Sequence, residues 1–220
     1  MNKRIGLIHS NRIAMEVLNK EIIANLKGID ILNFLDESIV VEIRKSEGIN
    51  PLVKSKFTRM VQSAIETSVD LILVSCSSIS SLTHSMPANI SVPIINVYEL
   101  FFKEMVKGES RFLILGTGSS AIEAVKNGLE TESSNTKTKP LIKTINCMQN
   151  REKKFLTGSD EYYQNIALSI EDILCEQNFD KVLLAQLSII PSIKFLRKDL
   201  QKRIFNAIPF AIKHIKRVLY

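Results

Sequence analysis

The chain has 220 residues, of which 45% are hydrophobic and 24% charged, and its formal net charge is +6 at pH 7. This composition is typical of a globular protein with a buried core, and the length suits one large domain or two small ones. No apolar stretch approaches the roughly 18 residues of a membrane span, and the apolar run Ile5–Ile8 is too short for an export signal. The three cysteines, at 76, 147 and 175, form neither an even set nor a metal-ligand spacing. We therefore expect a cytoplasmic protein with reduced thiols and no metal site.

The positive charge gathers late in the chain. A nucleic-acid-binding protein would usually interleave aromatic residues for base stacking or carry a known reading module, and neither accompanies these residues. We therefore expect solvated helix faces and no nucleic-acid partner. The basic residues concerned are Lys194, Arg197, Lys198, Lys202, Arg203, Lys213, Lys216 and Arg217.

Short apolar runs alternate along the chain with segments of helical spacing. Helix-period apolar residues mark 57–65 and 166–174, and Gly158-Ser159-Asp160 is typical of a start for the second of these helices. The polar stretches 130–139 and 149–154 are predicted to be surface loops. Strands that alternate with helices predict an α/β fold with parallel sheets. The predicted strands are Ile5–Ile8, Ile31–Leu35, Leu71–Ser75, Phe112–Leu115, Leu141–Ile145 and Val182–Ala185.

The two halves of the chain look like distant copies of each other. Ile8 and Leu115 each end a predicted strand, and a further strand ends close to Cys76 in the first half and to Gln186 in the second. The offsets agree, since 76 − 8 = 68 and 186 − 115 = 71. This spacing predicts two similar α/β lobes, each a parallel sheet flanked by helices, that face each other across a cleft. Cys76 and Gln186 would then occupy equivalent places on opposite walls.

The chain would cross between these lobes near Val92-Pro93-Ile94-Ile95. We accordingly predict a first lobe of residues 1–95 plus 206–220, which carries Cys76. The second lobe, residues 96–205, carries Gln186.

Cys76 is the strongest single candidate for a functional residue. It directly follows the strand Leu71–Ser75, and the carboxyl ends of strands are where ligands bind in open α/β sheets. A helix is expected next, and its N-terminus would favour the thiolate form of the side chain. The alternative is an inert cysteine that fills the strand end, because free cysteines are often buried.

With these pieces in place, the sequence resembles the aspartate/glutamate/hydantoin racemases. The resemblance implies two pseudo-symmetric α/β lobes, no metal or organic cofactor, and catalysis by thiols between the lobes. It also implies a homodimer and a small carboxylate or amino-acid substrate, with no membrane partner. The matching segments are Ile5-Gly6-Leu7-Ile8, the stretch 70–78, Val92-Pro93-Ile94-Ile95, the stretch 111–117 and the stretch 182–188.

Inversion of a carbon beside a carboxylate requires one acid/base group on each face, a role that thiols can fill in both directions. Hydroxyls and backbone N–H groups would hold the carboxylate. By motif position, the residues of this cradle are Ser10, Asn11, Ser77, Ser78, Thr117, Ser119 and Ser120. Each of them could equally be a helix cap. Asp36-Glu37-Ser38 resembles a pattern in one branch of the family, and a simple polar turn explains it equally well.

The sequence departs from the family at the second cysteine. Gln186 stands there, followed by Leu187 and Ser188, and an amide can donate hydrogen bonds but cannot exchange a proton near neutral pH. Cys147 and Cys175 do not match the position of the missing thiol. We therefore predict a racemase-like isomerase with Cys76 as its acid/base group and with Gln186 and Ser188 as substrate contacts. A one-base decarboxylase or isomerase of the same superfamily is the alternative.

Three other functions compete with this interpretation. Gly116-Thr117-Gly118-Ser119-Ser120 fits a dinucleotide fingerprint, but the next strand runs into Asn146-Cys147 instead of an acidic residue for the ribose. A thiol hydrolase would need a histidine, and His9 could lie near Cys76, whereas His84 and His214 have no supporting pattern. A protein that binds a small carboxylate without catalysis is the third possibility.

Overall fold

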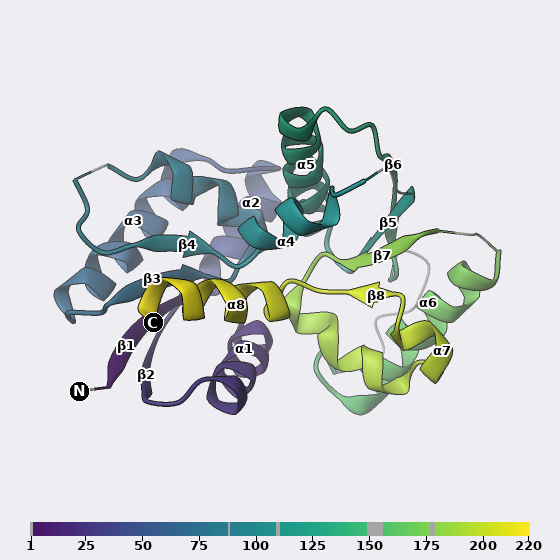
Figure 1. Cartoon of the computed structure of the whole chain (residues 1–220), viewed down its shortest axis with the longest axis horizontal. Coiled ribbons are helices and arrows are strands. Elements are labelled where there is room, and N and C mark those ends of the chain that lie inside the picture. Colours follow the sequence, from purple (N-terminus) through teal and green to yellow (C-terminus); the bar gives the residue numbers. More distant parts are fainter. Residues whose placement is uncertain (1, 88, 109–110, 149–155, 177–178) are drawn as a thin grey trace. The chain divides into compact units, whose positions relative to one another are not determined.

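A computed structural model describes residues 2–87, 89–108, 111–148, 156–176 and 179–220 (Figure 1). The chain forms two compact units. Unit 1 comprises Met1–Phe101 with Ala207–Tyr220, and unit 2 comprises Phe102–Asn206. The segment Val92–Ile95, predicted as the crossing between halves, instead leads into and enters a strand of unit 1, and the units change at Phe101.

Unit 1 is a four-stranded parallel sheet with helices on both faces. Its strands lie in the order β2-β1-β3-β4, and every neighbouring pair is parallel. The bounds are β1 (Lys3–His9), α1 (Arg12–Asn25), β2 (Ile29–Leu35), α2 (Ser38–Ser46), α3 (Pro51–Glu66), β3 (Leu71–Val74), the 3₁₀ helix η1 (Ser77–Ser85), β4 (Ile94–Asn96) and α8 (Ile208–Leu219).

Unit 2 repeats this plan with strand order β6-β5-β7-β8, again parallel throughout. The same order of strands confirms the predicted α/β class with two pseudo-symmetric halves. Its elements are β5 (Arg111–Gly116), α5 (Ser119–Thr136), β6 (Leu141–Asn146), α6 (Asp160–Glu176), β7 (Lys181–Leu184), the 3₁₀ helix η2 (Leu187–Phe195), α7 (Lys198–Gln201) and β8 (Ile204–Phe205). Helix α4 (Glu99–Met105) spans the change of unit.

The core of unit 1 forms around its central strands. All four residues of β3 are buried, as expected for a parallel strand covered on both faces. Phe57, Val61 and Ala64 lie on one stripe of α3 and pack with Ile72 of β3 in a single buried cluster. Figure 1 shows α2 and α3 on one face of this sheet and α1 and α8 on the other.

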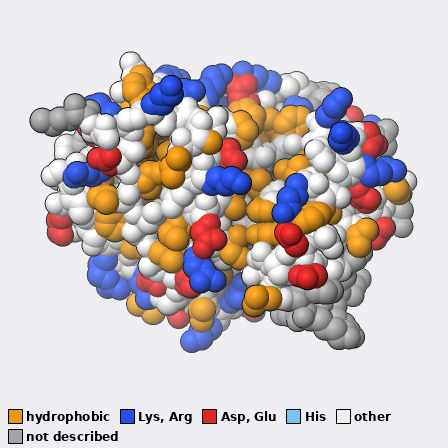
Figure 2. Space-filling view, turned by 90° about the horizontal axis from the view of Figure 1, so that it is seen from below, with side chains coloured by type: hydrophobic (Ala, Val, Ile, Leu, Met, Phe, Trp, Pro, Cys, Tyr) orange, Lys and Arg blue, Asp and Glu red, His pale blue; other side chains and the backbone are white. Residues whose placement is uncertain are grey.

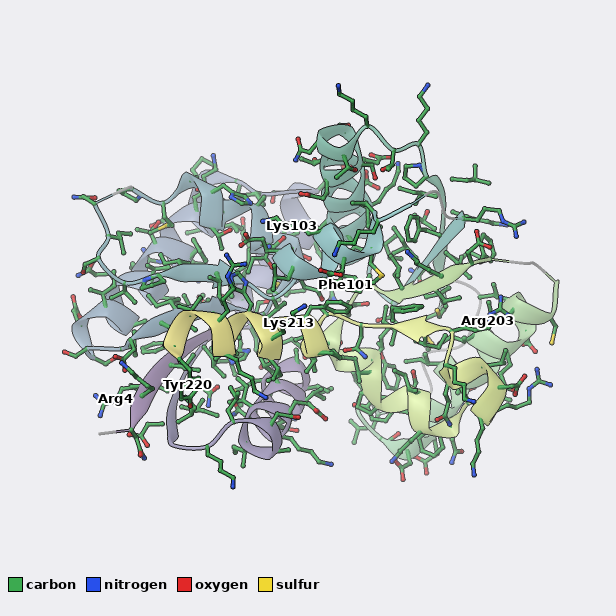
Figure 3. All side chains as sticks on the ribbon, viewed as in Figure 1. Arg4, Phe101, Lys103, Arg203, Lys213 and Tyr220 are labelled. Carbon is green, nitrogen blue, oxygen red and sulfur yellow. The ribbon has the colours of Figure 1, made fainter. Side chains whose placement is uncertain are left out.

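The C-terminal helix is fixed to unit 1 by aromatic side chains. The hydroxyl of Tyr220, labelled in Figure 3, donates a 2.7 Å hydrogen bond to the carbonyl of Lys27. The ring centroids of Phe101 and Phe210 are 5.5 Å apart. These contacts explain why a segment from the far end of the chain completes the first unit.

Two predicted loops have different outcomes. Residues 130–136 continue α5 instead of forming a loop, and the helix ends at Thr136, after which Lys137 has a left-handed conformation. Leu129 and Ser133 are buried on this helix, so packing of one face holds a polar stretch in helical form. The second predicted loop, 149–154, lies outside the described residues.

Charge on the surface is mixed. Among the late basic residues, Lys194 forms an ion pair with Asp160 at 2.9 Å, and Arg197 forms one with Asp199 at 3.6 Å. Figure 2 shows Lys and Arg interspersed with Asp and Glu on the face it displays. Within the described ranges, no helix combines the length and apolar character that crossing a membrane requires.

Candidate active site

Hydrogen-bond donors surround the sulfur of Cys76. This residue lies two positions after β3 and immediately before η1, so the element that follows it is a 3₁₀ helix. The Ser10 hydroxyl, from the loop after β1, donates to Sγ over 2.7 Å. The Ser78 side chain and the backbone N–H groups of Ser78 and Ile79 also hydrogen-bond to the sulfur. These donors would stabilise negative charge on Sγ.

Burial nevertheless raises the pKa of the Cys76 thiol, and the hydrogen bonds from Ser10, Ser78 and Ile79 only partly oppose it. The expectation of a thiolate at rest is therefore wrong. The sequence showed the helix start but not the desolvation, which disfavours the charged form. At neutral pH the resting Cys76 is a protonated thiol, which suits a proton donor.

The three cysteines should differ in their reaction with iodoacetamide. Cys175 is exposed, Cys76 is partly buried and Cys147 is buried. Because alkylation requires an accessible thiolate, we expect Cys175 to be labelled first at neutral pH. In a Cys175→Ser variant, labelling of Cys76 should rise with pH to a midpoint above the roughly 8.5 of an unperturbed thiol. Peptide mapping across a pH series measures this, and a midpoint below that value would contradict the raised pKa.

Tyr98 is a residue of this site that the sequence did not reveal. It is buried, two residues after β4, and its hydroxyl forms a hydrogen bond with the Ser77 side chain. Burial raises the pKa of Tyr98, and the nearby charge of a Cys76 thiolate raises it further. The phenol is therefore neutral next to the thiol. The sequence signal for Tyr98 would have been β4 (Ile94–Asn96): a strand predicted there would have placed Tyr98 just after its carboxyl end.

His9 lies at the end of β1 but its ring nitrogens bind other partners. Nδ1 is 2.7 Å from the Ser75 hydroxyl, and Nε2 is 3.0 Å from Oδ1 of Asn33. Burial lowers the pKa of His9 to about 4, against a weaker opposing effect of the Asn33 hydrogen bond. The ring is thus neutral, with Nε2–H donating to Asn33. His9 holds the strand ends that carry Ser10 and Cys76, and both of its ring nitrogens are occupied by partners other than the sulfur.

The buried neutral His9 should make the protein less stable in mild acid. Between pH 6.5 and about 4 the unfolded state binds a proton at His9 that the folded state does not. Stability therefore falls as pH is lowered through this window, by about 3 kcal/mol in total from this group. Denaturant unfolding at a series of pH values measures the slope. A His9→Gln variant should show a flatter slope, and an unchanged slope would contradict the assignment.

Three other predicted residues act as caps. The Asn11 side chain accepts a 3.0 Å hydrogen bond from Ala14 at the start of α1. Asp36 accepts from Ser38 at the start of α2 and pairs with Lys56 at 3.1 Å. Glu37 accepts from the backbone N–H of Arg12. None of these contacts reaches Cys76, so the turn and cap interpretation describes Asp36 and Glu37 here.

In unit 2, Gln186 occupies the position that Cys76 has in unit 1. Each lies two residues after its strand, β7 or β3, and immediately before a 3₁₀ helix. Oε1 of Gln186 accepts from the Thr117 backbone N–H at 2.7 Å and from the Thr117 hydroxyl at 3.1 Å. Thr117 follows β5 as Ser10 follows β1. The pair Thr117–Gln186 thus repeats the pair Ser10–Cys76.

Two further titratable side chains lie near Thr117. The buried Tyr162 forms a hydrogen bond with the Thr117 side chain, and the charge of Cys147 acts on the same phenol. Burial is the main cause that raises the pKa of Tyr162. Sequence reasoning set Cys147 aside and did not consider Tyr162. Its position three residues after the cap at Ser159, whose hydroxyl accepts from the Tyr162 backbone N–H, was the one available signal.

The remaining predicted contacts lie on helices of unit 2. Ser119 and Ser120 begin α5, and Ser188 is the second residue of η2. Ser10, Ser77 and Ser78 thus gather around Cys76 or its neighbour Tyr98 in unit 1, and Thr117 contacts Gln186 in unit 2. That Cys76 and Gln186 face each other stays a prediction. Among the residues that the structure describes, no group of three or more His, Cys, Asp or Glu side chains could hold a metal ion.

Comparison with known proteins places the fold among racemases. No model of a known protein family matches the sequence, and no curated protein matches it. Among solved structures, the aspartate racemase of Picrophilus torridus is similar with a TM-score of 0.72 at 11% identity, covering 99% of this chain and 94% of that one. Glutamate racemase RacE1 of Bacillus anthracis has a TM-score of 0.67 at 16% identity, with 99% and 81% covered. Allantoin racemase of Klebsiella pneumoniae has a TM-score of 0.66 at 14% identity, with 99% and 88% covered. The chain therefore has the two-unit α/β fold of these racemases.

Proposed function

We propose that this protein is a cofactor-independent, racemase-like isomerase that exchanges a proton at the carbon next to a small substrate's carboxylate. The observation that supports this most directly is the Cys76 sulfur, held at the end of a central strand by the Ser10 hydroxyl and two backbone N–H groups. The racemase fold supports the reaction type, because the solved structures with this fold include aspartate, glutamate and allantoin racemases.

In the proposed reaction the Cys76 thiol first gives its proton to a solvent base, water or hydroxide, and becomes a thiolate. The thiolate then removes the proton of the α-carbon, so that an S–H bond forms and the C–H electron pair moves into an enediolate. The hydroxyls of Ser10, Ser77 and Ser78 are the proposed groups that hold the carboxylate and steady the developing charge. Return of a proton from Cys76 restores the C–H bond on the same face, which gives exchange with retention. Inversion requires a proton from a second donor, such as a water molecule, on the opposite face, and Cys76 then keeps the proton that it removed. Because the resting thiol has a raised pKa, deprotonation must accompany substrate binding or be driven by higher pH.

Gln186 favours a second candidate, a one-base enzyme of the same superfamily. Because its amide cannot exchange a proton near neutral pH, Cys76 would be the one acid/base thiol, and exchange would occur without inversion, as in a decarboxylase that protonates an enediolate from one side. A protein that only binds a small carboxylate is the non-catalytic alternative. We also propose a cytoplasmic homodimer, based on the resemblance and on the free thiols of all three cysteines.

Solvent exchange tests these proposals directly. The protein is incubated in deuterium oxide with aspartate or glutamate of each configuration, and the α-proton signal is followed by proton NMR. Chiral chromatography of the same samples detects inversion. Exchange with inversion supports the racemase, and exchange with retention supports the one-base enzyme. The absence of exchange with every substrate would contradict the proposed chemistry and favour a binding protein.

A further inference from the structure

We infer that Gln186 is an oriented hydrogen-bond donor whose Nε2 group binds an oxygen atom of the substrate and positions it. In this inference Gln186 is a substrate-binding residue of unit 2 and not an acid/base group. The inference rests on the proposed function for the chemical class of the substrate, a small carboxylate.

The contacts of Thr117 determine the orientation of the Gln186 amide, with Oε1 toward Thr117 and Nε2 away from it. A backbone N–H can only donate, so the atom that accepts from it at 2.7 Å must be the carbonyl oxygen Oε1. The Thr117 hydroxyl donates to the same atom at 3.1 Å. Rotation of the amide by 180° would place Nε2 against the Thr117 backbone N–H, which cannot accept a hydrogen bond. The side chain of Gln186 therefore has one favoured orientation.

Gly116, beside Thr117, makes room for this orientation, and Gly118 lies in ordinary contact with the amide. A Cβ atom on Gly116 would lie 3.2 Å from Oε1 of Gln186 and 2.7 Å from Cγ1 of Ile122. A Cβ atom on Gly118 would lie 3.6 Å from Nε2. The amide thus lies over the turn between β5 and α5. Gly116 of the pattern that suggested a dinucleotide site thus has a local explanation, because a Cβ atom there would crowd Ile122 and, less severely, Gln186.

The other end of the amide is available to a ligand. Gln186 is only partly buried, and within the described parts of the chain Nε2 has no hydrogen-bond partner. A group with two N–H donors and no acceptor selects a carboxylate or carbonyl oxygen and discriminates against an ammonium group. At the equivalent place in unit 1, the thiol of Cys76 can exchange a proton. The two halves of the repeat therefore carry different functions at matching positions.

Gln186→Glu tests the direction of this hydrogen bond with almost no change of shape. One carboxylate oxygen can still accept from Thr117, but the other replaces Nε2 and repels a substrate carboxylate. We expect glutamate and aspartate, the probes in calorimetric titrations, to bind about 10- to 100-fold more weakly at pH 7.5. As the pH is lowered toward 5, protonation of the introduced carboxylate restores an O–H donor, so the deficit should shrink. The wild type should show no matching recovery.

Gln164→Glu is the matched control, because Gln164 is exposed on α6 of the same unit and the substitution introduces the same charge. This variant should bind both probes as the wild type does, and thermal unfolding should confirm that both variants fold. Thr117→Val removes only the hydroxyl and keeps the backbone donor, so it should weaken binding less than Gln186→Glu does.

Three results would overturn the inference: equal binding by the wild type and Gln186→Glu, a loss in Gln186→Glu that does not recover at lower pH, and no binding of either probe to the wild type. These results are separate from those that test the proposed function. Probe binding with the expected pH recovery but without α-proton exchange would refute the catalysis and keep the donor role. If Gln186→Glu leaves α-proton exchange unaffected, the proposed catalysis stands and the donor role of Gln186 is refuted.

Discussion

Replacement of Cys76 by serine should abolish α-proton exchange while the protein still folds. A serine hydroxyl is a far weaker base than a thiolate, and loss of a positioned acid/base group typically lowers the rate by about 10²- to 10⁴-fold. The Ser10 hydroxyl and the backbone N–H groups of Ser78 and Ile79 can still donate to the new oxygen, so the local structure should persist. Proton NMR in deuterium oxide measures exchange, and calorimetry measures binding separately.

Cys175→Ser is the control for this experiment, because Cys175 is an exposed thiol on α6. It should leave both exchange and binding unchanged. Wild-type turnover by Cys76→Ser on an identified substrate would refute the proposed mechanism, although the fold would stand. Loss of binding together with exchange would mean that the sulfur also contributes to holding the substrate.

The central strands could be predicted because their sequences are continuous apolar runs. The runs ending at Ile8, Leu115 and Val74 each needed only pattern and length for recognition, and the matching offsets between halves predicted the repeat. Strands β4 and β8 were missed because they contain three and two residues, too few for any periodic signal. Strand β4 forms by pairing with β3, and β8 by pairing with β7. Such pairing between distant segments is not encoded in the local sequence.

The position of the site was predictable, but its electrostatics were not. Cys76 follows a strand and therefore lies at the sheet's carboxyl edge, where Ser10 also lies after the neighbouring strand. The partnership of Ser77 with Tyr98, and of Thr117 with Tyr162, joins segments distant in sequence. The direction of the Cys76 pKa shift depends on how much water the surrounding segments exclude. That quantity is a property of the packed structure.

Gln186→Cys should give the protein inversion activity, or increase it, because the substitution supplies the proton donor that position 186 lacks. Thr117 presents its backbone N–H and hydroxyl toward the side chain at position 186, as Ser10 presents its hydroxyl to Cys76. Such donors would partly oppose the cost of burying a thiolate in unit 2, as the Ser10 hydroxyl does in unit 1. Chiral chromatography of aspartate and glutamate after incubation measures the inverted product.

Gln186→Ser is the matched control, because serine keeps a small polar side chain but cannot exchange protons as a thiol does. The double variant Cys76→Ser/Gln186→Cys completes the comparison. If inversion requires one thiol from each unit, it should appear in Gln186→Cys and vanish both in the control and in the double variant. Deuterium should then enter the inverted product from the solvent. Inversion that persists in the double variant would show that one thiol is enough, and inversion in neither variant would mean that position 186 does not face the second side of the substrate carbon.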